Sequence, residues 1–152
     1  MPVSRLWARR PRSAPAESGD FDACVGDSVA DCVSPAAHES PHVSPIDVAQ
    51  HQLDAYNAHD LQRFLEVYAE DVEVWRMPAT EPSLRGRAAL GEFYANERFH
   101  LPALHAELVN RIAVGDTVVD HERVSGLREQ PFEVVAVYRI SGGLIRCVWF
   151  HS

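Results

Sequence analysis

The sequence contains no lysine among its 152 residues, so all 14 of its positively charged side chains are arginine. This absence excludes catalysis through a lysine Schiff base and the phosphate-binding loop that depends on a lysine. The motifs Gly-x-Gly-x-x-Gly, Gly-x-Ser-x-Gly and Cys-x-x-Cys are missing as well. The sequence therefore offers no motif for nucleotide binding, serine hydrolysis or thiol redox chemistry.

Cysteine is also scarce, with Cys24, Cys32 and Cys147 as its only occurrences. An odd number of cysteines is no disulfide framework, and we expect a reducing, cytoplasmic location. No apolar run approaches the roughly 20 residues of a membrane span, and no apolar stretch follows the N-terminal arginines as in a secretory signal. The net charge of −8 argues against nucleic acid or an anionic membrane as partner.

Hydrophobic residues make up 46% of the chain, enough for a single domain with a real core. They are unevenly distributed. Residues 1–44 are rich in proline, alanine, serine and aspartate and show no persistent apolar period. Such a composition does not bury enough apolar surface to offset the entropy cost of ordering. We expect residues 1–44 to be a disordered tail and residues 45–152 to be the folded domain.

The domain is expected to start with helices. Ser44 and Pro45 suit the cap and first turn of a helix, whose apolar face has the spacing of Ile46, Ala49, Leu53 and Tyr56. Asp60 is placed to cap a second helix, with an apolar face of Leu61, Phe64, Leu65 and Tyr68. A short strand at 72–74 and a proline-containing loop at 77–82 follow. A third helix is expected after Gly86.

The hydrophobic period changes from 3.6 to 2 after Pro102, which predicts strands. The expected strands cover 106–114, 118–125, 133–140 and 144–150. A tight turn at Gly115 joins the first and second of these strands, and another at Gly142–Gly143 joins the third and fourth. Gly126 opens the longer connection between the second and third. Helices first and a meander of strands afterwards predict an α+β fold with an antiparallel sheet.

Four segments carry a resemblance to a known family: Tyr56-Asn-Ala-His-Asp-Leu, Tyr68-Ala-Glu-Asp-Val, Arg85-Gly-Arg-Ala-Ala-Leu-Gly-Glu-Phe-Tyr and Gly142-Gly-Leu-Ile-Arg-Cys-Val-Trp-Phe. In this order, residues 45–152 resemble the SnoaL-like branch of the nuclear-transport-factor-2-like superfamily, which includes ketosteroid isomerases, polyketide cyclases and limonene-epoxide hydrolases. The resemblance implies a cone-shaped α+β fold: a curved antiparallel sheet wrapped around N-terminal helices and enclosing an apolar pocket. It also implies a homodimer formed through the outer face of the sheet.

The catalytic positions of two family branches hold other residues in this chain. The catalytic tyrosine of ketosteroid isomerases matches Gln52, and their general-base aspartate matches Arg76 or Met77. Their protonated aspartate matches Ala136. The arginine of limonene-epoxide hydrolases matches Arg123, but their two aspartates match Ser125 and Phe150. Neither the isomerase proton shuttle nor epoxide opening has its carboxylates at these positions.

The densest ionisable cluster is Asp120-His121-Glu122-Arg123, on an expected strand. Side chains alternate along a strand, so His121, Arg123 and Ser125 share one face. By the resemblance, that face points into the cone. His121 would then act as general base near neutral pH, and Arg123 would steady an oxyanion. The alternative is that these charges form a cross-strand network or a dimer contact.

The remaining expectations concern the pocket and its ligand. The pocket wall is expected to include Gln52, Tyr56, Tyr68, Trp75, Tyr94, Ser125, Ala136, Tyr138 and Phe150. No metal site or cofactor is expected, because His100, His105, His121 and Glu107 follow no ligand motif. The expected function is binding of a small hydrophobic or polycyclic molecule, with a cofactor-independent isomerase or cyclase reaction. The alternative is a non-catalytic binding or dimerisation module.

Overall fold

The computed structural model describes residues 43–152. The expected tail at 1–44 therefore lies outside the described residues, apart from its last two. The elements are α1 (Pro45–Asn57), α2 (Leu61–Glu66), β1 (Tyr68–Arg76), β2 (Leu84–Arg85), α3 (Arg87–Glu97), β3 (His105–Val114), β4 (Thr117–Ser125), β5 (Phe132–Ser141) and β6 (Leu144–His151). The expected α+β class and its order of helices before the meander are confirmed. No helix within 43–152 is long and apolar enough to cross a membrane.

The six strands form one curved sheet in the order β2-β1-β6-β5-β4-β3. Hairpin connections make β3, β4, β5 and β6 successively antiparallel. The expectation of a wholly antiparallel sheet is wrong at one place, because β1 runs parallel to β6. No hairpin joins these two strands, so no turn dictates their relative direction. The sheet is therefore mixed.

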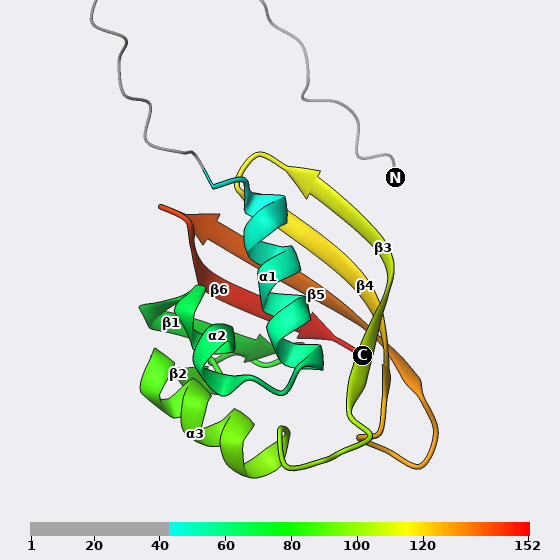
Figure 1. Ribbon diagram of the computed structural model, residues 1–152. Helices are drawn as coiled ribbons and strands as arrows, with labels where there is room; N and C mark the ends of the chain where they lie inside the picture. The colour runs from blue at the N-terminus through cyan, green and yellow to red at the C-terminus, as the bar shows by residue number, and fades with distance from the viewer. Residues whose placement is uncertain (1–42) are drawn as a thin grey trace, which may run out of the picture. The chain divides into compact units, whose positions relative to one another are not determined.

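The helices cover the concave face of the sheet, and Figure 1 shows α1 lying across it with α2 and α3 near the β1 edge. Both predicted caps are present. The Ser44 side chain accepts a hydrogen bond from the backbone N–H of Ile46, and the Asp60 side chain accepts one from that of Arg63. Asn57 then fixes the end of α1 against β3, because its side-chain amide exchanges two hydrogen bonds with the backbone of Ala106, at 2.8 and 2.9 Å.

Some predicted boundaries and faces were wrong. β1 is nine residues long and begins at Tyr68, a residue that the apolar spacing places in the second helix. Ile46 is 45% exposed, whereas Val48 and Gln52 of the same helix are buried. The other three residues predicted for that face, Ala49, Leu53 and Tyr56, are buried, so the apolar spacing identified the helix and most of its inner face.

Gly126 ends β4 in a conformation that only glycine adopts easily. Its φ is +76°, and a side-chain carbon built there would lie 2.0 Å from the backbone oxygen of Ala103. The chain therefore turns sharply at this point, next to the loop that precedes β3. This turn starts the connection 126–131 between β4 and β5.

Candidate functional site

A cavity of about 330 Å³ lies on the concave side of the sheet. Its walls come from α1, from the ends of β1, α3 and β6, and from β4, β5 and the connection between them. The lining residues are Gln52, Leu53, Tyr56, Arg76, Met77, Tyr94, Arg98, Glu122, Val124, Leu127, Arg128, Phe132, Val134, Tyr138, Phe150 and Ser152. This volume is at the lower end of the range for sites that bind organic molecules.

The side chains of β4 face the opposite way from the prediction. Asp120, Glu122 and Val124 are buried on the concave face, at 0%, 6% and 6% exposure. His121 and Arg123 therefore lie on the outer face, and neither lines the cavity. The placement of these two residues inside the cone was wrong. The error arose because the wrong face of β4 was assigned to the interior. A shift of one position along a strand exchanges all inward and outward side chains.

On the outer face, His121 and Arg123 belong to a cross-strand charge network. His121 Nε2 lies 2.8 Å from a carboxylate oxygen of Glu133, and Arg123 lies 3.4 Å from Glu107 and 3.5 Å from Glu133. Arg123, Glu107 and Glu133 have side chains about half exposed to solvent. This arrangement is the cross-strand network named as the alternative.

The carboxyl group in the cavity belongs to Glu122. Its Oε1 atom is buried and has no hydrogen-bond partner among the described residues. Burial, together with the nearby charge of Asp120, raises the pKa of Glu122 from 4.5 to about 7, and Arg111 opposes this rise. An unpartnered carboxyl group that titrates near neutral pH at a cavity wall is a candidate acid or base.

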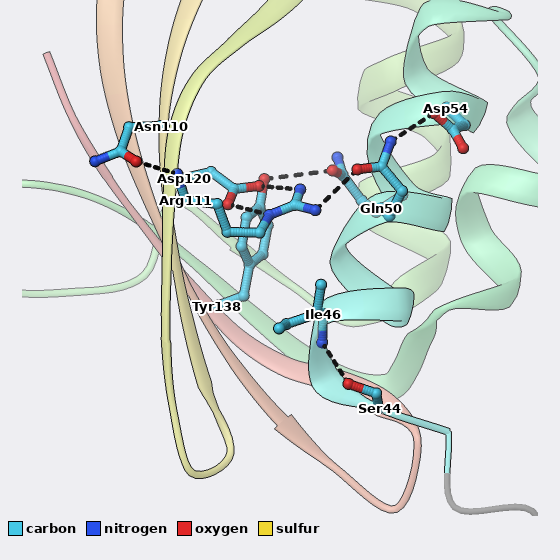
Figure 2. A network of polar contacts seen from close by, with 9 residues as sticks. Ser44, Ile46, Gln50, Asp54, Asn110, Arg111, Asp120 and Tyr138 are labelled. Atoms are coloured by element: carbon cyan, nitrogen blue, oxygen red, sulfur yellow. Dashed lines mark hydrogen bonds and ion pairs between the residues drawn. The ribbon is translucent and has the colours of Figure 1, made fainter.

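A buried ion pair supports this face of the strand. Arg111 of β3 holds Asp120 with two hydrogen bonds of 2.6 and 2.7 Å, and its third nitrogen donates to the side chain of Gln50 at 2.9 Å. Gln50 in turn donates to Asp54 at 2.8 Å. Figure 2 shows how this chain of contacts joins the sheet to α1. The pair fixes Asp120 and so fixes the charge that acts on Glu122 two residues away.

Tyr56, Tyr94 and Tyr138 line the same cavity as Glu122. Burial raises the pKa of Tyr94 to about 12 and the pKa of Tyr56 and Tyr138 further above the ordinary value, and the charge of Glu122 adds to the rise in all three. The Tyr138 hydroxyl donates to Gln52 Oε1 at 3.4 Å. These phenols stay protonated at neutral pH, so they are hydrogen-bond donors on a wall that also carries a carboxyl group.

Of the nine residues expected in the pocket wall, five line the cavity: Gln52, Tyr56, Tyr94, Tyr138 and Phe150. Four do not. Tyr68 is buried in the core with its ring 5.0 Å from that of Phe64, and Ala136 is buried opposite Asp120. Trp75 is half-buried, and Ser125 donates from the outer face to a backbone oxygen of β3.

Sequence reasoning missed Glu122, Arg98 and Arg128 as cavity residues. A signal for Glu122 was present in β5, where the alternate residues Phe132, Val134, Ala136, Tyr138 and Ile140 are all apolar and define the inner face. Because Glu122 pairs with Val134 across the sheet, it shares that face. No group of three or more histidine, cysteine or acidic residues within 43–152 has an arrangement that could hold a metal ion, the His100, His105, Glu107 and His121 set included.

Many solved structures are similar to the chain, among them the following three. A cystatin-fold protein from Novosphingobium aromaticivorans has a TM-score of 0.67 and 25% identity over 72% of this chain and 98% of its own. A SnoaL-like protein from Burkholderia thailandensis has a TM-score of 0.59 and 26% identity, covering 70% of this chain and 92% of its own.

The third structure is a protein with a ketosteroid isomerase-like fold from Catenulispora acidiphila, in complex with trimethylamine. Its TM-score is 0.57 at 15% identity, with 70% of this chain and 85% of that chain covered, so it shows a shared fold alone. No curated protein matches the chain. The family model of the SnoaL-like domain matches residues 49–148, from α1 to β6. On this match, the chain belongs to the SnoaL-like domain family.

Proposed function

We propose that the chain binds a small, largely apolar carbonyl compound in the concave cavity and moves a proton on it, with Glu122 as the acid–base group. The observation that carries the proposal is the carboxyl group of Glu122, 6% exposed, with one unpartnered oxygen and a pKa of about 7. A general base works best when its pKa lies near the operating pH. Glu122 takes the role that the sequence had assigned to His121.

The reaction class is proton transfer next to a carbonyl group. In its ionised form Glu122 would take the proton from a carbon adjacent to the carbonyl, and the C–H electron pair would form an enolate. The neutral phenols of Tyr56 and Tyr94 are donors for the enolate oxygen. Returning the proton from Glu122 to another carbon completes an isomerisation, so neither a metal nor a redox cofactor is required by the balance of the reaction.

The apolar wall supports the same ligand class. Leu53, Leu127, Phe132, Val134 and Phe150 line the cavity beside these polar groups. A wall of apolar side chains with a few polar groups is typical of sites for small organic molecules. At about 330 Å³ the cavity favours a compound of one or two rings over the polycyclic molecules that the resemblance implied.

The test is isomerisation and hydrogen–deuterium exchange of small β,γ-unsaturated ketones by the purified chain in D₂O. We expect the Glu122→Gln variant to lose 10²- to 10⁴-fold in rate, the usual size of a general acid–base contribution. The Glu133→Gln variant removes the same charge from the outer face of the neighbouring strand and should keep the wild-type rate. The wild-type kcat/KM should rise with pH through about 7, as Glu122 loses its proton.

An equal rate for Glu122→Gln and the wild type would contradict the role of Glu122. Binding of the ketones without any exchange, in wild type and variants alike, would favour the second candidate, a binding module without chemistry. That candidate is favoured by one specific observation: Ala136 and Arg76 stand where the isomerase branch is expected to carry carboxylates. The expected homodimer stays a prediction, which light scattering of the purified chain checks directly.

A further inference from the structure

The cavity is positively charged in a protein whose net charge is −8. Three arginines line it, Arg76, Arg98 and Arg128, whereas Glu122 is the one carboxyl side chain among its lining residues. The three arginines come from separate elements: the end of β1, the C-terminal end of α3, and the connection between β4 and β5. Their convergence is therefore a property of the fold and is not the result of a basic sequence run.

Aromatic rings hold these guanidinium groups at the cavity. The Cζ atoms of Arg76 and Arg98 lie 5.4 and 4.7 Å from the centre of the same Phe93 ring, and that of Arg128 lies 3.9 Å from the centre of the Phe132 ring. Stacking of this kind restrains the long side chain and leaves its edge N–H groups able to bind a ligand. One of them is already used, because Arg98 Nη1 donates to the backbone oxygen of Glu97 at 2.9 Å. Less conformational freedom is then lost when an anion is bound.

The same three arginines have no carboxylate partner among residues 43–152. That part of the chain contains ten arginines, and five of them form ion pairs with carboxylates: Arg85, Arg87, Arg111, Arg123 and Arg146. Three of the other five are those of the cavity. Arginines elsewhere in the domain are thus largely neutralised by their neighbours, and the cavity retains unneutralised positive charge even when Glu122 is ionised.

We propose that the ligand of this cavity is a small ring compound bearing an oxyanion, either a carboxylate or a phosphate, which is bound by Arg76, Arg98 and Arg128. The inference rests on the proposed function only in using the same cavity. The arginines are half-buried or exposed, whereas Glu122 is buried, so the anionic group lies towards the mouth and the reacting carbon lies deeper. Guanidinium groups bind both kinds of oxyanion through paired N–H donors.

Four benzene derivatives of similar shape provide the test: benzoate, phenyl phosphate, neutral benzamide and cationic benzamidine. Isothermal titration and thermal shift with the full chain measure their binding. We expect the two anions to bind at least tenfold more tightly than the neutral and cationic compounds, and we expect this advantage to shrink as salt is raised. The tighter of the two anions identifies the oxyanion as carboxylate or phosphate.

Substitutions locate the binding group. Replacing Arg76, Arg98 or Arg128 with glutamine should weaken binding of the preferred anion about tenfold or more in each case, as expected for a lost charged hydrogen bond. Arg139→Gln is the matched control, because Arg139 is exposed, lies outside the cavity and forms no ion pair within 43–152. It should leave binding unchanged. Thermal unfolding of each variant establishes that it is folded.

The Glu122→Gln variant separates this inference from the proposed function. Anion binding that is kept or strengthened in this variant supports the arginine site, whatever happens to catalysis, because the substitution removes a negative charge. Equal binding of benzoate and benzamide by the wild type would overturn the inference. So would folded Arg76, Arg98 and Arg128 variants that bind the anions as Arg139→Gln does.

Discussion

The two faces of β4 and β5 carry the same kinds of residue in opposite environments. Glu122 and Glu133 lie on neighbouring strands, one register position apart. Glu122 faces the cavity, and burial raises its pKa to about 7. Glu133 faces outward, and hydrogen bonds from His121 and Arg123, led by His121, lower its pKa. The direction of a side chain from the sheet thus decides whether a carboxyl group holds its proton near neutral pH.

The ion pairs of the two faces differ in the same way. On the inner face Arg111 and Asp120 make two short hydrogen bonds, with the Asp120 side chain fully buried. On the outer face Arg123 reaches its two carboxylates at 3.4 and 3.5 Å, with all partners well exposed. Buried pairs cannot lose one partner without leaving a charge unpaired, whereas exposed pairs are replaced by water at little cost.

The largest effect is expected from breaking the inner pair. Arg111→Ala should lower the free energy of unfolding by about 3–5 kcal/mol, because it leaves the Asp120 carboxylate buried without its cation. Urea unfolding at pH 7 measures the loss. Arg123→Ala, the matched change on the outer face, should leave the unfolding midpoint close to that of the wild type.

A double variant separates the effect of the unpaired charge from that of lost packing at the Arg111–Asp120 pair. In Arg111→Ala/Asp120→Ala the buried charge is removed together with its partner, so part of the lost stability should return relative to Arg111→Ala. If Arg111→Ala unfolds at the same urea concentration as Arg123→Ala, the buried ion pair contributes no more to stability than the exposed one. The contrast drawn between the two faces would then be wrong.

The second prediction concerns the pH dependence of stability. Glu122 has a pKa of about 7 in the folded chain and an ordinary value of 4.5, so the folded state binds more protons than the unfolded state between these values. The resulting stabilisation is fully present below pH 4.5 and is lost as the pH rises through 7. The free energy of unfolding of the wild type should fall by about 3 kcal/mol over this range relative to that of Glu122→Gln. This figure follows from about 1.4 kcal/mol per unit of pKa difference.

Urea unfolding of both proteins between pH 4.5 and 8.5 measures this difference directly. Glu133→Gln is the control, because Glu133 is exposed and its pKa moves the other way. A wild-type and a Glu122→Gln curve that stay parallel over the whole range would show that the Glu122 carboxyl group titrates as it does in the unfolded chain. The case for Glu122 as a base near neutral pH would then be lost.

The fold was largely predictable from the sequence, and the reasons are local. Ser44 and Asp60 fix two helix starts, glycine turns fix the hairpins, and the period of 2 after Pro102 identifies the strands. These signals act over a few residues. The parallel pairing of β1 with β6 has no such local signal, because the two strands are about 70 positions apart in the chain.

The site was harder to predict because it depends on which face of β4 points inward. Val118 and Val124 are apolar on one face of the strand and Val119 on the other, so the strand by itself gives no clear answer. The connection 126–131 is too long to fix the register by turn geometry. The resemblance to epoxide hydrolases favoured the face of Arg123, and the packing of β5 selects the other. Arg98 and Arg128 lie outside the strands, where no periodic pattern applies.

The smallest effect is expected on the outer face, from His121→Ala. His121 is the main cause of the lowered pKa of Glu133, so carbon-detected NMR titration should find that pKa moved back towards 4.5 in the variant. A lowered pKa stabilises the folded state above pH 4.5, and this stabilisation is lost as the pH falls through the folded value. Because Glu133 is exposed and water screens the pair, the unfolding midpoint at pH 7 should stay that of the wild type. Turnover should be unchanged too, and a tenfold loss of rate in His121→Ala would return the outer face to the candidate site.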